Sequence, residues 1–285
     1  MKWWHPIAAA VAALIPTGAR AAPAPKTRLD LAFVLLATPK LPREQDVIRA
    51  FATFAPKEKP LRPQPKSPSD SPDDYKQALA FALGPDAGAL VMLMPAAVPK
   101  GEADEAAKYS VRALGTGWKL PAHKAHLIVT CSQPAGAPRI ESLARFTALL
   151  AAVAKAAGAV GVYWGNSGAT HDPAFLMDVA RESELEARMM VWSGISVARE
   201  PGGRLSLLSL GMKQLDLPDL LLTSPPGKND EALSYFFTLL AYVAGRGKAI
   251  ADGETVGRTA QERLKVKYVP SPVDKGKKVW RVELP

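Results

Sequence analysis

The chain has 285 residues, 48% of them hydrophobic, and a formal net charge of +9 at neutral pH. This length and composition predict one large globular domain or two small ones, and they exclude a globally disordered chain. The single cysteine, Cys131, excludes an internal disulfide and a cysteine-based zinc site. Because Cys131 follows an apolar run, we expect it to be buried in a strand. The excess positive charge gathers in residues 258–285 with few aromatic residues between, which is typical of a solvated surface and makes nucleic acid an unexpected partner.

Residues 1–21 have the three parts of a secretory signal peptide. Lys2 precedes an apolar run at 7–15, and Ala19-Arg20-Ala21 offers a cleavage pattern of the A-x-A type. The apolar run is too short to span a bilayer, so we expect no transmembrane segment in the mature chain. The leader predicts export, to the periplasm in a bacterium, with residues 22–28 as a linker. A mis-assigned start in front of a cytoplasmic domain is the alternative.

Residues 29–132 are expected to form an N-terminal α+β half. Apolar runs predict strands at 29–36 and 126–132, and the pair 78–83 and 89–94 is typical of a hairpin. Helical periodicity predicts helices from residue 42 to about 56 and at 102–114. Residues 56–72 contain six prolines and predict an extended surface loop. The order β-α-β-β-α-β is that of the split βαβ, or ferredoxin-like, arrangement.

The patterns predict that the same order of elements recurs after a connecting helix within 133–158, whose expected bounds are 139–157. In the C-terminal half, 159–285, the patterns predict strands at 159–164, 189–198, 205–210, 265–269 and 278–284, with helices at 172–183 and 229–244. The expected fold is therefore α+β, with two ferredoxin-like halves packed together and antiparallel or mixed sheets.

Residues 164–171 contain several polar and aromatic side chains and lie between an expected strand and an expected helix. Asp172 and Pro173 would be the N-cap and the first residue of that helix. Loops in this position often carry function in α/β proteins. We therefore predict a ligand-binding site there. A carboxylate or phosphate could also bind basic side chains, an arginine through its bidentate fork; the candidates are Arg199, Arg204, Lys213 and Arg258. The predicted site residues are Trp164, Asn166, Ser167, Thr170, His171 and Arg258.

The same loop allows other interpretations. Ser167 lacks the full G-x-S-x-G pattern of a nucleophile elbow because Ala169 takes the last position, and no acid partner for His171 is identifiable. A tight turn without function is one alternative. The histidine spacing predicts no metal site, and no cofactor is expected. The favoured function is a non-enzymatic module that binds a small molecule or protein. The alternatives are a hydrolase-like enzyme using Ser167 or His171, and a purely structural or interaction protein.

Several segments together resemble an uncharacterised bacterial family known only as a domain of unknown function. They are the WGNSGATH run within 162–171, the GMKQL-x-LPD run at 211–219, the segment 256–259 and, less distinctively, 123–126. The resemblance covers roughly residues 29–285. It implies no activity, cofactor or catalytic residue. It also implies a chain without a leader, which is evidence against export.

Overall fold

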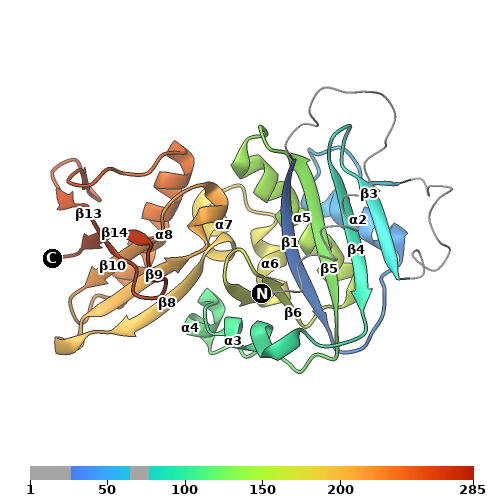
Figure 1. Ribbon diagram of the computed structural model, residues 1–285, viewed down its shortest axis with the longest axis horizontal. Coiled ribbons are helices and arrows are strands. Elements are labelled where there is room, and N and C mark those ends of the chain that lie inside the picture. Colours follow the sequence, from blue (N-terminus) through green and yellow to red (C-terminus); the bar gives the residue numbers. More distant parts are fainter. Residues whose placement is uncertain (1–26, 65–76) are drawn as a thin grey trace.

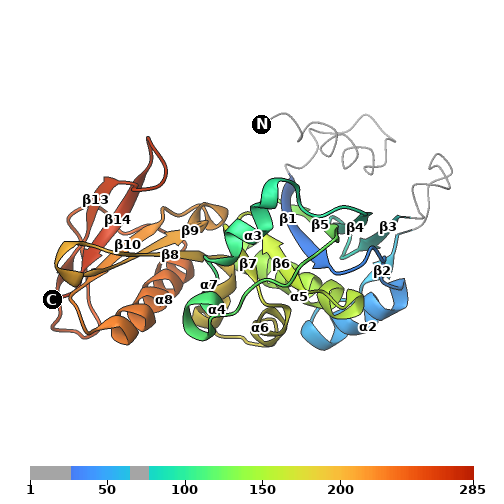
Figure 2. The ribbon, with the colours of Figure 1, turned by 90° about the horizontal axis from the view of Figure 1, so that it is seen from below.

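Two β-sheets lie side by side, each covered on one face by helices, in a computed structural model of the protein (Figure 1; Figure 2). The structure describes residues 27–64 and 77–285. The expected leader at 1–21 and the part of the expected proline-rich loop from residue 65 on lie outside the described residues. The fold is α+β, as the sequence predicts. No helix within the described ranges is both long enough and apolar enough to cross a membrane.

The first sheet is antiparallel throughout, in the order β2-β3-β4-β5-β1-β6-β7. Its central strands β1 and β5 pair over their full length of ten residues, from Thr27 opposite Pro134 to Leu36 opposite Ala125. The strand bounds are Thr27–Leu36 (β1), Arg62–Pro63 (β2), Ala78–Ala82 (β3), Gly88–Met94 (β4), Ala125–Pro134 (β5), Gly161–Trp164 (β6) and Ala169–His171 (β7). Cys131 is buried in β5, as expected.

Two helices, α2 (Glu44–Phe54) and α5 (Arg139–Ala157), pack on one another and cover one face of this sheet (Figure 2). The bounds of α5 are those that the sequence predicts. Its residue Phe146 is fully buried and meets the Trp164 ring edge-on, with 5.2 Å between ring centroids. The single helix expected at 102–114 is instead two short ones, α3 (Glu102–Ala107) and α4 (Val111–Thr116), near the β6–β7 end of the sheet. A short helix α6 (Pro173–Val179) follows β7 and packs on α5.

The second sheet is mixed, in the order β13-β14-β10-β9-β8, and only β10 and β14 run parallel. Helices α7 (Leu185–Trp192) and α8 (Asn229–Arg246) pack on one another, and α8 lies against one face of the sheet (Figure 2). The strand bounds are Gly194–Arg199 (β8), Leu205–Leu210 (β9), Leu220–Ser224 (β10), Lys267–Pro270 (β13) and Lys278–Glu283 (β14). A two-stranded sheet of β11 (Thr255–Val256) and β12 (Leu264–Lys265) and the 3₁₀ helices η2 (Pro99–Gly101), η3 (Pro201–Gly203) and η4 (Met212–Leu215) complete the described elements.

Ferredoxin-like halves are not confirmed. In a split βαβ unit, the strands on either side of the helix run parallel with one strand between them. Here β1 and β3, the strands that flank α2 in the expected order, run antiparallel, with β4 and β5 between them. The long apolar runs of β1 and β5 favour each other as neighbours because their full-length ladder satisfies the most backbone groups.

Two further segments differ from expectation. Residues 159–171, assigned from the sequence to the C-terminal half, supply β6 and β7 to the first sheet. The strand expected at 189–198 is the end of α7 followed by β8. Its first residues form an apolar run, Met189 to Trp192, and a short buried run of this kind fits a strand or a helix equally well.

Candidate functional site

The loop predicted as a site is a tight turn between two strands. The backbone N–H of Ser167 donates to the Trp164 carbonyl oxygen at 2.9 Å, and that of Gly168 donates to the Gly165 carbonyl oxygen at 3.1 Å. The chain then runs back along β6 as β7 before α6 begins. Asp172 caps α6 as predicted, since its carboxylate accepts from the Ala174 N–H at 3.0 Å. The turn therefore connects the two strands of a hairpin, whereas the sequence predicts a loop between a strand and a helix.

Most of the predicted site residues lie inside the protein. Trp164, Ser167, Thr170 and His171 are each 0% exposed. The Ser167 hydroxyl donates to the Trp164 carbonyl oxygen at 2.9 Å, and the Thr170 hydroxyl donates to the Ala103 carbonyl oxygen at 2.6 Å. These side chains hold the turn and its neighbours together, and their burial leaves them out of reach of a ligand in this conformation.

His171 sits between two serine hydroxyls. Its Nε2 atom is 3.4 Å from the Ser167 hydroxyl, and its Nδ1 atom is 3.5 Å from the Ser110 hydroxyl. Burial lowers the pKa of His171 from 6.5 to about 4, against the smaller opposing effect of a hydrogen bond to the Val191 backbone. The imidazole is therefore neutral at neutral pH. A buried, neutral ring with weak hydroxyl neighbours fits a structural histidine better than a catalytic base.

The turn is also the place where the second sheet packs against the first. The Gly194 N–H, at the start of β8, donates to the Ser167 carbonyl oxygen at 2.8 Å. A Cβ atom on Gly194 would lie 2.6 Å from that oxygen, and one on Gly211 would lie 2.1 Å from the Asn166 carbonyl oxygen. Gly211 also has a φ of +96°, which side-chain-bearing residues rarely adopt. Two glycines thus allow the backbones to approach this closely.

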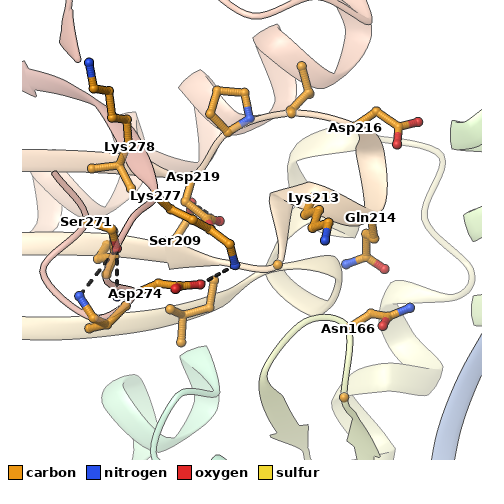
Figure 3. A pocket seen from close by; sticks show the side chains of 18 of the residues that line it. Asn166, Ser209, Lys213, Gln214, Asp216, Asp219, Ser271, Asp274, Lys277 and Lys278 are labelled. Carbon is orange, nitrogen blue, oxygen red and sulfur yellow. Dashed lines mark hydrogen bonds and ion pairs between the residues drawn. The ribbon is translucent and has the colours of Figure 1, made fainter. Parts of the chain in front are cut away.

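A cavity of about 660 Å³ opens at this junction. Its wall includes β1 from the first sheet, the turn at Gly165 and Asn166, the end of β9, the segment 211–219 with η4, and the segment from 271 into the start of β14. Asn166 is exposed and lines the cavity, and it is the predicted site residue that does so. Figure 3 shows Asn166, Lys213 and Gln214 gathered around one part of the cavity.

Gln214 is one of several buried residues that line the cavity, with 8% of its surface exposed. Its Nε2 atom donates to the Trp192 carbonyl oxygen. Its Oε1 atom is buried and has no hydrogen-bond partner among the described residues. Most buried polar atoms in proteins have a partner, so this orphan acceptor in a cavity-lining residue is a candidate contact for a ligand, which reaches Oε1 once the side chains that cover it move aside.

Most charges around the cavity are already paired. Arg139 binds the buried Asp30 carboxylate through both terminal nitrogens and donates through Nε to the Gln214 carbonyl oxygen at 2.6 Å. Arg28 pairs with Asp216 at 2.8 Å, and Lys277 pairs with Asp274. The Arg28–Asp216 pair and the hydrogen bond from Arg139 to the backbone of Gln214 join β1 and α5 to the segment around η4, so they also hold the two sheets together.

Asp219 serves the local fold. It accepts from the Ser209 hydroxyl at 3.0 Å and from the Met212 N–H at 3.1 Å, at the start of η4. Burial raises the pKa of its carboxyl, while these hydrogen bonds oppose the rise. Since this carboxylate occupies the N-terminal end of η4, an external anion finds no free N–H group of Met212 there.

Apolar side chains of the second sheet form another part of the cavity wall. Leu208, Leu210 and Val279 line it. They belong to a small cluster separate from the main core and lie on the sheet face opposite α8, whose side holds Leu207 and Leu222. The cavity therefore combines an apolar wall with a polar end, a composition typical of small-molecule sites.

Arg258 is not among the residues that line this cavity. It forms ion pairs with Glu262 and Glu231, and its guanidinium lies 5.7 Å from the centre of the Tyr235 ring. These carboxylates raise the pKa of Arg258 above its ordinary value, Glu262 most, through its hydrogen bonds to the guanidinium. Arg258 thus anchors its own loop to α8.

The sequence places Lys213 among basic residues that could bind a carboxylate or phosphate, but it does not single out Gln214. Both residues occur in the GMKQL run, which otherwise contributed only to the family resemblance. A glycine followed by a short polar turn directly after a strand could have marked this segment as a loop to examine.

Residues 208–283 match a protein family described as a domain of unknown function, DUF4261. The match covers the end of β9, η4, β10, α8 and the following strands, and it includes Lys213 and Gln214. No curated protein matches the chain. No solved structure matches it either.

Proposed function

We propose that the protein is a non-enzymatic binding module whose ligand occupies the cavity beside the turn at 165–168. The observation that carries this proposal is the orphan Oε1 atom of the buried Gln214 in the cavity wall. The volume of about 660 Å³ falls in the range of small-molecule sites, roughly 300–1,000 Å³. A small molecule therefore suits the cavity better than a protein partner.

The arrangement gives a hydrolase little support. Ser167 and His171 are both fully buried, and the Ser167 hydroxyl is already donated to a backbone carbonyl. A nucleophile must reach the reacting carbon of its substrate. We therefore retain the turn as part of the proposed site through its exposed residue Asn166, with Trp164, Ser167, Thr170 and His171 as its internal support.

A fragment screen read by protein-observed NMR tests the proposal. Ligands in the cavity should shift the backbone amide signals of Gly165, Asn166 and Gly211 at millimolar concentration, while the signals of exposed residues on α8 stay unchanged. Asn166→Ala should weaken the binding of these fragments. It should not change the midpoint of thermal unfolding, because the Asn166 side chain is exposed.

The exposed Lys248, which follows the C-cap of α8 and is not among the lining residues, provides a matched control, Lys248→Ala. That variant should leave fragment affinity unchanged. If no fragment shifts the three amides, or if fragments bind without affecting them, the proposal is wrong.

A further inference from the structure

We infer that the ligand of this cavity is a small organic acid that carries an N–H or O–H donor near its carboxylate and an apolar side group. The inference rests on the proposed function and specifies its ligand. Three features of the cavity wall, each from a different residue set, give the three parts of this ligand.

The carboxylate follows from the basic residues that are not already paired. Three of the five basic side chains in the wall, Arg28, Arg139 and Lys277, are committed to aspartates. Lys213 and Lys278 form no ion pair with another described residue. An anionic group can therefore bind Lys213 without displacing an existing partner.

A carboxylate fits better than a phosphate. Phosphate sites usually use arginine forks or free backbone N–H groups at a helix start. Here the Arg139 guanidinium is occupied by Asp30, and the Asp219 carboxylate already accepts from the Met212 N–H at the start of η4. The ammonium group of Lys213 suits a singly charged group.

The donor follows from Gln214. Its amide orientation is determined by the Trp192 carbonyl oxygen, which accepts from Nε2 and could not accept from an oxygen. Oε1 is therefore the free end of the amide, and a ligand donor would satisfy it once the side chains that cover it move aside. Lys213 and Gln214 are neighbours on η4 and both lie by Asn166 in Figure 3, so the ligand donor should be close to its carboxylate.

The apolar group follows from Leu208, Leu210 and Val279. These side chains form the wall that the second sheet contributes. An aliphatic group of the ligand placed there would be removed from water, which favours binding.

Three related probes separate the parts of the inference. N-acetyl-leucine has the carboxylate, the N–H and an aliphatic side chain. N-acetyl-leucinamide lacks the charge, and 4-methylpentanoate lacks the N–H. In NMR titrations of the full chain, followed at the amides of Gly165, Asn166 and Gly211, N-acetyl-leucine should bind about tenfold more tightly than either analogue, the usual scale for losing one good polar contact.

Variants assign the contacts. Lys213→Gln should remove the preference for N-acetyl-leucine over its amide, while Lys248→Gln should retain it. Gln214→Leu should remove the preference for N-acetyl-leucine over 4-methylpentanoate. Because Gln214 is buried, this variant could fail to fold, but the comparison of the three probes on the unaltered protein tests the inference without it.

The outcomes distinguish this inference from the proposed function. If neutral or cationic fragments bind at the three amides and N-acetyl-leucine does not, or binds no better than its analogues, the ligand class is wrong and the binding module stands. If nothing binds at these amides, both are wrong.

Discussion

Acidification should destabilise the protein through His171. Burial lowers the pKa of this imidazole in the folded protein from 6.5 to about 4. Between these values the unfolded chain binds a proton and the folded chain does not, so the free energy of unfolding falls as the pH falls. The contribution of His171 is fully present above a pH of about 6.5 and is lost progressively down to about pH 4.

The size of the effect follows from the two pKa values. Between about pH 7.5 and about pH 5, the difference in proton binding between the unfolded and the folded protein lowers the free energy of unfolding by about 2 kcal/mol. Urea unfolding of the unaltered protein and of His171→Gln at these two pH values measures it. The variant should lose about 2 kcal/mol less than the unaltered protein on acidification.

A second histidine provides the control. Burial also lowers the pKa of His126, whose ring hydrogen-bonds the Ala96 carbonyl oxygen at 2.7 Å. His126→Gln should remove only its own share of the pH dependence and leave the His171 share intact. Equal losses on acidification in the unaltered protein and in His171→Gln would show that His171 is not buried in its neutral form, and the account of the turn would be wrong.

Three further substitutions test the packing around the site. Phe146→Ala should lower the unfolding free energy by about 3–5 kcal/mol, because the ring is fully buried against Trp164, whereas Glu141→Ala on the exposed face of α5 should change it by less than about 0.5 kcal/mol; similar urea midpoints would contradict the helix register. Arg139→Met should lower the free energy of unfolding by about 3–5 kcal/mol, because it leaves the buried Asp30 carboxylate unpaired. Adding Asp30→Leu should recover much of that loss, and a double variant as unstable as Arg139→Met alone would contradict this explanation. Gly211→Ala should lower the thermal midpoint and shift the Asn166 amide signal, because its Cβ would lie 2.1 Å from the Asn166 carbonyl oxygen; a native midpoint and spectrum would refute this contact.

Local patterns predicted elements where one segment determines its own structure. The apolar stripe of 139–157 predicted α5 with its observed bounds, and the run at 205–210 predicted β9. The prediction of a strand at 189–198 was wrong in its first part because the short apolar run has neither a clear helical nor a clear strand periodicity. Packing against α8 favours the helix α7 there. The strand order failed for a different reason, since pairing β1 with β5 depends on residues about a hundred positions apart.

The sequence by itself determined the α+β class, the burial of Cys131 and the cluster of polar and aromatic side chains along 164–171. Only the tertiary structure decided which of those side chains face the interior. Strand alternation and the approach of Gly194 and Gly211 bury Ser167 and its neighbours, and they leave Asn166 at the cavity. A site assembled from β1, a turn, η4 and β14 depends on contacts between distant segments, and spacing along the chain contains no measure of those distances.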